Sequence, residues 1–426
     1  MLDIKLFREN PKLIKESLKK RKDSEKLKLV NEIIKLDQDW RDKKLKLDEL
    51  RKKRNEVSHN IAKFKKEGKD VKKFLEEASK IPTKLEKLEK DVEYIKNKLN
   101  ENLMRMPNIL HESVPYGKDD TENKEIRKWG KPYKFDFELK SHVEILENLG
   151  LVDFERSAKI SGSGFYILLG DLALLEQAVT RFAINTMLKK NFVLLQPPLM
   201  MRRQPYEGVT DLEDFENVMY KIDNDDEYLI ATSEHPMAAM YMNETIDESQ
   251  LPLKFVGSSM CFRKEIGAHG IDTKGLFRLH QFNKVEQFVF CKPEESWKLH
   301  EEMIKNAEEV FQALEIPYRI VNICTGDIGT VAAKKYDLEG WSPRQKKYTE
   351  LCSCSNVTDY QARRLNIKYG KEGGEKQILH TLNSTVVATS RVLVAIIENY
   401  QNKDGTVTIP KVLLPYMDKK KLLKKL

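Results

Sequence analysis

Apolar residues recur at a three-four spacing through most of the first quarter of the chain. Between residues 33 and 64 eight of ten positions at this spacing are apolar, and between residues 71 and 102 nine of ten are. Such heptads are typical of coiled-coil helices. Residues 67–70 are enough to reverse the chain between them. The pattern predicts an antiparallel helical hairpin whose first helix is roughly 60 Å long, with a kink or a restarted helix at Pro82.

The heptads end after Leu103, and the chain then changes character. Residues 106–120 are rich in turn formers and indicate a linker. The pattern beyond predicts helices at 172–189, 294–314 and 390–399, and strands at 192–200, 255–263 and 278–290. Because no repeated βα unit and no phosphate-binding glycine loop is present, the fold class expected is α+β with an antiparallel sheet. We expect two domains, an arm at 1–110 and a catalytic domain at 111–426.

The positive charge is concentrated in the predicted hairpin. Residues 1–110 contain 32 Lys and Arg against 21 Asp and Glu, whereas the remainder contains 43 against 46. The whole net charge of +8 therefore arises in the first quarter. This asymmetry is typical of a nucleic-acid-binding segment joined to a neutral body. A lysine-rich helical pair kept soluble by its charge, or a dimerisation device, is the alternative interpretation.

Several protein classes are excluded by simple features. The sequence contains no run of 18 apolar residues, which argues against a transmembrane helix and a membrane partner. The first eight residues lack the apolar core of a signal peptide. Five cysteines, an odd number in a long chain, do not form a disulfide framework. We expect a cytoplasmic protein.

Charged and aromatic residues gather in the predicted strand pair after residue 255. Arg263 and Arg278 suit phosphate or carboxylate oxygens, because a guanidinium donates two parallel hydrogen bonds. Phe282 can stack on a base. Farther along, Glu350 and Ser353 offer hard oxygen ligands suited to Mg²⁺. For one Arg-x-Glu alone, a surface hairpin with paired charges would be the simpler interpretation, but the additional segments favour a nucleotide site.

These residues carry a resemblance to a known family. Phe262-Arg-Lys-Glu265 and Arg391 resemble motifs 2 and 3 of class II aminoacyl-tRNA synthetases, and Gln196-Pro-Pro198 is similar to motif 1. Four further segments resemble the seryl-tRNA synthetase family specifically, at residues 1–11, 232–236, 272–282 and 350–356. The resemblance covers essentially the whole chain. Asn383-Ser-Thr385 is similar to the archaeal and eukaryotic branch.

The resemblance implies a fold, a reaction and partners. The fold would be a six-stranded antiparallel sheet in a homodimer. The reaction would be ATP-dependent activation of L-serine to seryl-adenylate, followed by transfer to tRNA(Ser), with tRNA(Sec) left open as a second substrate. The basic N-terminal arm would bind the long variable arm of the tRNA.

The resemblance also implies roles in ATP binding. Arg263 would hold the α-phosphate and the seryl carboxylate, and Arg278 the γ-phosphate. Glu265 would read the adenine amino group, with Phe282 and Arg391 stacked on opposite faces of the ring. Arg263 and Arg391 would be catalytic, and Glu350 and Ser353 would hold Mg²⁺ against the phosphates. The remaining ATP contacts would be Lys264, Leu279, Leu351 and Cys352.

A second group of residues would surround serine. The members implied are Thr232, Glu234, Arg263, Glu286, Asn383 and Thr385. Carboxylates suit this pocket because they accept hydrogen bonds from an ammonium group and a small hydroxyl. Buried acceptors left unpaired would reject alanine. Thr385 stands where the family commonly has serine, which retains the hydroxyl.

Other interpretations are weaker. Cys352-Ser-Cys354 lacks a second Cys or His pair, so no protein-bound zinc is expected, and the other cysteines are expected in the core. His269 and His280 are expected to be structural, and residues 419–426 to end a solvated helix.

The alternative functions also fit less well. A non-catalytic relative would not need the intact set of arginines and carboxylates, and a relative that charges a carrier protein would lack the basic arm. A threonine or proline enzyme would need an anticodon-binding domain after Arg391, where 35 residues are too few.

Overall fold

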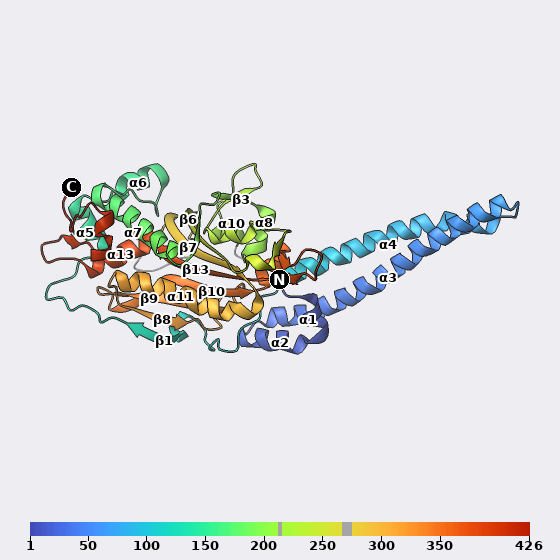
Figure 1. Cartoon of the computed structure of the whole chain (residues 1–426), viewed down its shortest axis with the longest axis horizontal. Coiled ribbons are helices and arrows are strands. Elements are labelled where there is room, and N and C mark those ends of the chain that lie inside the picture. Colours follow the sequence, from blue (N-terminus) through green and yellow to red (C-terminus); the bar gives the residue numbers. More distant parts are fainter. Residues whose placement is uncertain (212–214, 266–274) are drawn as a thin grey trace. The chain divides into compact units, whose positions relative to one another are not determined.

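The computed structural model describes residues 1–211, 215–265 and 275–426 (Figure 1). His269 and the first part of the 272–282 segment lie outside the described residues. The chain forms two compact units, Met1–Pro107 and Asn108–Leu426. Each unit has its own apolar core, so each is described separately.

The first unit is entirely helical. It contains α1 (Ile4–Glu9), α2 (Pro11–Lys20), α3 (Ser24–Lys66) and α4 (Lys72–Arg105). The Asp23 side chain caps α3 by accepting from the backbone N–H of Lys26. The two long helices lie side by side along a buried apolar row of Leu47, Val57, Ile81 and Leu85 (Figure 1). The predicted hairpin is confirmed.

Of the two outcomes expected at Pro82, a kink or a restarted helix, the restart is wrong, because α4 runs through this residue as one element. Proline removes the N–H that would bind the carbonyl four residues earlier, which weakens an isolated helix. Here Ile81 and Leu85, on either side of the proline, are both buried in the same row against α3. Tertiary packing therefore stabilises α4 on both sides of the proline.

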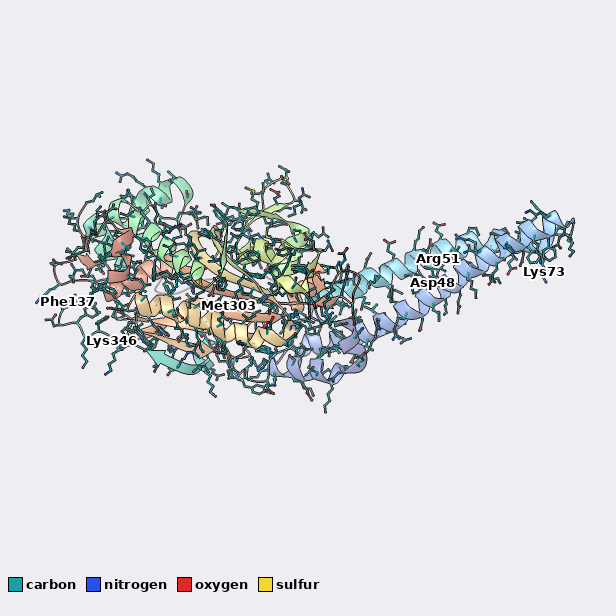
Figure 2. All side chains as sticks on the ribbon, viewed as in Figure 1. Asp48, Arg51, Lys73, Phe137, Met303 and Lys346 are labelled. Atoms are coloured by element: carbon teal, nitrogen blue, oxygen red, sulfur yellow. The ribbon has the colours of Figure 1, made fainter. Side chains whose placement is uncertain are left out.

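Ion pairs flank this apolar row. Lys43 pairs with Asp91 at 2.5 Å and Arg51 with Glu89 at 2.7 Å, in each case between α3 and α4. Figure 2 shows Arg51 and its neighbour Asp48 among the charged side chains along the helices. Exposed pairs of this kind each contribute little free energy. They favour one register of the hairpin, while the apolar row supplies most of its stability.

The second unit is built on an eight-stranded sheet. Its order is β1 (Lys124–Trp129), β8 (Tyr318–Asn322), β9 (Lys334–Ser342), β10 (Lys347–Thr358), β13 (His380–Ala388), β7 (Gln281–Cys291), β6 (Leu253–Phe262) and β2 (Val193–Leu195). The α+β class with an antiparallel sheet is confirmed. The expected number of six strands is wrong: the six strands β8 to β6 form the antiparallel centre, but β1 adds to one edge and β2 pairs parallel with β6 at the other.

Helices cover both faces of this sheet. α7 (Gly170–Leu188), α11 (Ser296–Ala313) and α13 (Thr389–Asn399) pack on one face, where Val285 and Val289 of β7 are buried (Figure 1). On the other face α8 (Arg203–Val209), α10 (Glu234–Ala239) and α12 (Tyr360–Leu365) pack around Phe288 and Phe290. Since side chains alternate along β7, Lys284 and Glu286 share this second face.

The remaining elements are short and complete the second unit. They are η1 (Asp120–Glu122), α5 (His142–Leu149), α6 (Phe154–Ser161), β3 (Met200–Arg202), α9 (Phe215–Val218), β4 (Glu227–Leu229), β5 (Thr245–Asp247), η2 (Glu248–Gln250), η4 (Pro293–Glu295), β11 (Lys368–Gly370), β12 (Gln377–Ile378), η5 (Lys411–Tyr416), β14 (Val407–Thr408) and β15 (Leu422–Leu423). The expected helix end at residues 419–426 is wrong, because β15 pairs with β14 and buries Leu423. None of the described helices has both the length and the apolar character to cross a bilayer.

The apolar row of the hairpin generates a prediction. Leu47 is 3% exposed, whereas Leu45, two residues earlier on the same helix, is 61% exposed. Leu47→Ala should lower the free energy of unfolding of the hairpin by about 2–4 kcal/mol, because it leaves a cavity. Leu45→Ala should change it by less than about 0.5 kcal/mol. Amide hydrogen exchange of α3 and α4 in the full chain measures both, and equal protection in the two variants would contradict this assignment of the core.

Candidate active site

The site begins with the register of β6 and β7. Cys261 lies opposite Phe282, Ser259 opposite Lys284, and Gly257 opposite Glu286. On the other side of β7, Thr385 of β13 is also the partner of Glu286. Because side chains alternate, Phe282, Lys284 and Glu286 form a row on one face of the sheet. The aromatic ring of Phe282, the cation of Lys284 and the anion of Glu286 therefore lie on the same face of the sheet.

Glu286 lies at the inner end of the row and is 1% exposed. The Lys284 Nζ is 2.5 Å from its Oε2 and also donates to the Thr232 Oγ1 at 3.2 Å. The Thr385 Oγ1 donates to the same Glu286 oxygen at 3.1 Å. Burial raises the pKa of Glu286, and Lys284 and Thr385 oppose that rise. Sequence reasoning predicted Glu286, Thr232 and Thr385 but missed Lys284.

Glu234 lies nearby at the start of α10. Its Oε1 accepts from the Asn383 Nδ2 at 3.0 Å and from the Gln361 Nε2 at 3.1 Å. Burial, followed by the negative charge of Glu286, raises the pKa of Glu234 to about 7. This carboxyl therefore titrates near neutral pH. Asn383 and Glu234 were predicted as partners of one ligand, whereas Gln361 was not predicted.

Gly257 allows the segment that carries Thr232 and Glu234 to approach the strand that carries Glu286. A Cβ at this position would lie 2.8 Å from the Ser233 Oγ and 2.8 Å from the Met237 Cε. Both contacts are closer than side chains tolerate. The absence of a side chain at residue 257 therefore lets Ser233 and Met237, which flank Glu234, pack closely on β6 opposite Glu286.

A cleft of about 130 Å³ opens beside these residues. It is lined by eleven predicted residues, namely Arg263, Glu265, Arg278, Leu279, Phe282, Glu350, Leu351, Cys352, Ser353, Thr385 and Arg391, and by Phe277, Lys284, Ala388 and Ser390, which were not predicted. Lys264 is not among the lining residues; its backbone N–H donates to the carbonyl of Val218 at 3.0 Å. The structure thus gathers residues from β7, β10, β13 and α13, and from the segments just after β6 and just before β7, around one space.

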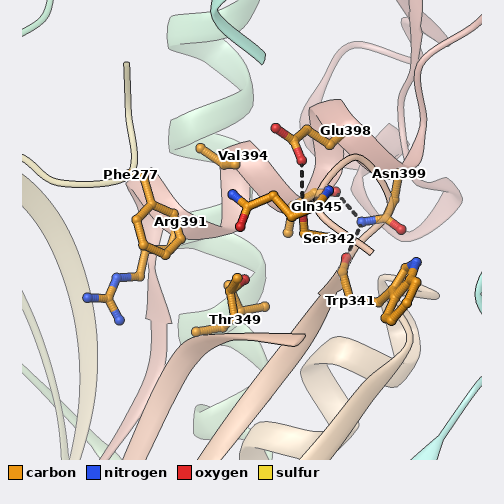
Figure 3. A pocket seen from close by; sticks show the side chains of 11 residues that line it. Phe277, Trp341, Ser342, Gln345, Thr349, Arg391, Val394, Glu398 and Asn399 are labelled. Atoms are coloured by element: carbon orange, nitrogen blue, oxygen red, sulfur yellow. Dashed lines mark hydrogen bonds between the residues drawn. The ribbon is translucent and has the colours of Figure 1, made fainter. Parts of the chain in front are cut away.

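Two arginines of the cleft rest on aromatic rings. The Arg263 guanidinium lies 5.4 Å from the Phe282 ring centre, and its Nε donates to the carbonyl of Ala231 at 3.2 Å. Arg391 lies 5.2 Å from the Phe277 ring centre, and Figure 3 shows the two side chains together. Cation–π contacts of this kind hold a guanidinium flat against a ring. Each contact therefore keeps its guanidinium against a wall of the cleft.

The outer part of the cleft is strongly charged. Glu350 is 3.2 Å from Arg391, and Arg278 is 3.8 Å from Glu265. Burial would raise the pKa of Glu350, but Arg391 and Lys335 outweigh it and lower the pKa to about 2. Glu350 is therefore ionised at any physiological pH.

Cys261, Cys291 and Cys324 are buried, as expected of core residues, and His280 contacts two aromatic side chains. All five cysteines are free and buried. The Cys352 Sγ donates to the carbonyl of Val386 at 3.3 Å, and burial raises the pKa of this thiol. His280 stacks on Phe165 with ring centres 5.3 Å apart and lies 2.6 Å from the Tyr220 hydroxyl. Within residues 1–211, 215–265 and 275–426 no group of three or more His, Cys, Asp and Glu side chains is arranged to hold a metal ion.

Two family models match the chain. A model described as the seryl-tRNA synthetase N-terminal domain matches residues 1–110, and the tRNA synthetase class II core domain (G, H, P, S and T) matches residues 217–400. A serine–tRNA ligase of Methanocella arvoryzae is 56% identical over 98% of this chain and 99% of its own length. That of Pyrococcus horikoshii is 51% identical over 99% and 98%.

Solved structures agree with these sequence matches. The crystal structure of seryl-tRNA synthetase from Pyrococcus horikoshii complexed with ATP is 50% identical, covers 100% of both chains and has a TM-score of 0.95. The cytoplasmic enzyme of Naegleria fowleri in complex with AMP is 39% identical, with a TM-score of 0.89 over 100% of this chain and 99% of its own. The chain therefore belongs to the seryl-tRNA synthetases, class II ligases that use ATP to join serine to tRNA.

Proposed function

We propose that serine is activated between the carboxylates of Glu234 and Glu286 and the cleft that Arg263 lines. The observation that carries this proposal is the placement of a fully buried carboxylate, Glu286, and a partly buried one, Glu234, next to residues that line an arginine-lined cleft. Such carboxylates bind a small ammonium and hydroxyl group strongly, because they have given up most of their water. Thr232, Asn383 and Thr385 complete the pocket through their bonds to the two glutamates and Lys284.

In the first step an oxygen of the serine carboxylate attacks the α-phosphorus of ATP. The new P–O bond forms as the bond to pyrophosphate breaks, which yields seryl-adenylate. A terminal hydroxyl of tRNA then attacks the seryl carbonyl carbon, and AMP leaves. Arg263 would hold both reacting groups in line and offset the negative charge that develops on the phosphoryl oxygens.

The other cleft residues would bind the rest of ATP. Phe282 offers a ring face to adenine once Arg263 moves to the α-phosphate, and Arg391 would stack on the opposite face. Glu265 would accept from the adenine amino group, and Arg278 would pair with the γ-phosphate. Their mutual distance of 3.8 Å makes them a weak pair that ATP can replace. Lys264, Leu279, Leu351 and Cys352 remain proposed contacts around the nucleotide.

Mg²⁺ would be held by Glu350 and Ser353, together with the phosphates. The two residues line one cleft, and Glu350 is ionised because its pKa is about 2. A set of one carboxylate and one hydroxyl suits Mg²⁺, which keeps several waters and phosphate oxygens as ligands. The bound ion would supply charge that offsets the negative phosphates during transfer.

We propose that protein-bound zinc plays no part in this site. Both sulfur atoms of Cys352-Ser-Cys354 donate to backbone carbonyls, of Val386 at 3.3 Å and of His300 at 3.7 Å. Burial raises the pKa of each thiol, so neither is a thiolate at neutral pH. Zinc binds the thiolate form.

The basic arm, residues 1–110, would select tRNA(Ser) for a catalytic domain at residues 111–426. Its 32 Lys and Arg offer phosphate contacts. Most of them lie on the two long helices α3 and α4, whose core is too thin to hold a catalytic site. The same arm would bind tRNA(Sec) if this tRNA is a second substrate, so a charging assay includes it.

A homodimer in the cytoplasm completes the proposal. The edge strand β2 leaves Val193 60% exposed and Leu194 42% exposed, an apolar edge that a second copy could cover. Five free cysteines, all reduced in the structure, suit the reducing cytoplasm.

The pocket should accept serine alone among the standard amino acids. With Mg²⁺ and ATP and without added zinc, serine should support ATP–pyrophosphate exchange, whereas alanine should leave Glu234 and Glu286 without a hydroxyl partner and fail. Exchange with each of the 20 amino acids measures this. Exchange with another amino acid but not with serine would refute the serine pocket. Loss of exchange after chelation of zinc in excess Mg²⁺ would refute the zinc-free part.

Arg263 and Glu286 should act on different kinetic constants. Arg263→Ala should lower kcat of exchange by about 100-fold or more, because its charge acts on the transition state. Glu286→Gln keeps the size of the side chain but removes its charge, so it should raise the serine KM strongly and the ATP KM little. Steady-state exchange with each substrate varied gives both constants. Equal changes in the serine and ATP KM for both variants would contradict these separate roles.

Deleting most of the arm should separate activation from charging. A protein in which a short Gly-Ser linker replaces residues 27–103 keeps every proposed active-site residue and the core of the second unit. It should form seryl-adenylate at a near-normal rate and still sediment as a dimer, whereas charging of tRNA(Ser) should collapse. Binding of tRNA by the full chain should weaken steeply with salt, because released counterions drive it. Charging that survives the deletion would show that the arm is not the recognition element.

A further inference from the structure

Gln361 is a fully buried polar side chain that the roles described so far do not use. It lies on α12, and its Nε2 donates to the Glu234 Oε1 and to the carbonyl of Val209, each at 3.1 Å. The Thr381 Oγ1 donates to its Oε1 at 2.7 Å. Every polar atom of this amide therefore has a partner.

These partners fix the orientation of the amide. If the amide were rotated by half a turn, its oxygen would face two acceptors, the Glu234 carboxylate and the carbonyl of Val209. The amide oxygen would then face the oxygens of Glu234 and Val209 with no hydrogen between them, and such unsatisfied buried acceptors are costly in free energy. The hydroxyl of Thr381 donates to the oxygen, which suits this orientation. Gln361 is thus held as a donor toward Glu234.

The amide acts on one oxygen of the carboxylate. Gln361 and Asn383 both donate to the Glu234 Oε1. In the part of the chain that the structure describes, these are the side-chain donors within hydrogen-bond distance of this carboxylate, so its Oε2 is left for a ligand. Two donors on one oxygen also prevent the carboxylate from rotating.

The charge of Glu234 depends on several neighbouring elements. On β7, Glu286 opposes its ionisation and Lys284 favours it; Arg263, after β6, also favours it. His235, next along α10, is neutral because burial lowers its pKa to about 3. α12 and β13 contribute the two neutral amides, whose N–H groups stabilise the ionised form.

We propose that Gln361 is a positioning residue for serine recognition, which holds the Glu234 carboxylate ionised and turns its free oxygen toward the polar groups of bound serine. This inference rests on the serine pocket proposed above. Gln361 itself would not touch the substrate. Its effect would pass through the charge and the orientation of Glu234.

The sign of the pH dependence follows from the donors. Loss of the Gln361 N–H removes a stabilising bond from the ionised carboxylate, so the pKa of Glu234 rises above its value of about 7. More Glu234 is then neutral at about pH 7, and serine binds less well. Raising the pH to about 8.5 ionises the group again and restores binding.

The test is Gln361→Met, which keeps the length of the side chain and removes both donors. At about pH 7 the serine KM in pyrophosphate exchange should rise about 10- to 100-fold, as expected for a lost bond to a charged group. The ATP KM should change by less than about twofold. At about pH 8.5 the difference in serine KM between the variant and the unaltered protein should shrink by about threefold or more.

Gln287→Met is the matched control. Gln287 is also fully buried, and its amide is also hydrogen-bonded through both its nitrogen and its oxygen, donating to the carbonyl of Met303 at 3.1 Å and accepting from Asn306 at 2.7 Å. It lies on the opposite face of β7 from Glu286, toward α11. Its substitution should lower the melting temperature comparably and leave the serine KM unchanged.

A milder variant covers the case in which Gln361→Met does not fold. Thr381→Val removes the hydroxyl that orients the amide, so it should raise the serine KM by about threefold to tenfold with the same dependence on pH. An unchanged serine KM in the folded variants, a parallel rise in the ATP KM, or a rise that does not shrink at high pH would overturn the proposal. Absence of serine-dependent exchange in the unaltered protein would instead refute the serine pocket itself.

Discussion

The site depends on keeping one carboxylate, Glu286, nearly without water on the face of a sheet, with a second, Glu234, beside it at the start of α10. Glu286 is 1% exposed, and an isolated ion in that position would cost several kcal/mol. Lys284, at 2.5 Å, offsets this cost, and the Thr385 hydroxyl adds a further bond. Removing either charge would leave the other buried without its partner. The Lys284–Glu286 pair therefore contributes both to the stability of the central strand β7 and to the charge of the pocket.

Strand register is what delivers these partners. Lys284 and Glu286 are two residues apart on one strand, and Thr385 faces Glu286 from the next strand. A slip of one residue in β7 would turn both charges into the apolar layer beneath α7 and α11. Val285, which lies between them, and Val289 are buried in that apolar layer and prevent the slip. Core and site are thus specified by alternate residues of the same strand.

The sequence was sufficient to predict structure and site residues where a repeating pattern or a family motif carried the information. Heptads predicted the hairpin of α3 and α4, and the motif segments identified eleven residues that the cleft brings together. It was insufficient where tertiary contacts decide. Pro82 is carried through a helix by packing, and Lys284 resembles any solvated lysine until β13 places Thr385 beside its partner Glu286. Gln361 has no local signal, because its partners lie 127 and 20 residues away.

Two glutamates of the same site show how burial and neighbours set opposite states. Arg391 and Lys335 hold the pKa of Glu350 at about 2, so this side chain is a permanent anion beside the phosphates. Glu234 faces the anion Glu286 instead, and its pKa of about 7 leaves its charge conditional on the surrounding donors. A fixed charge suits a group that would hold a metal ion throughout the reaction. A conditional charge suits a group that recognises a small ligand, because a cationic ligand itself completes the ionisation of the carboxyl group that binds it.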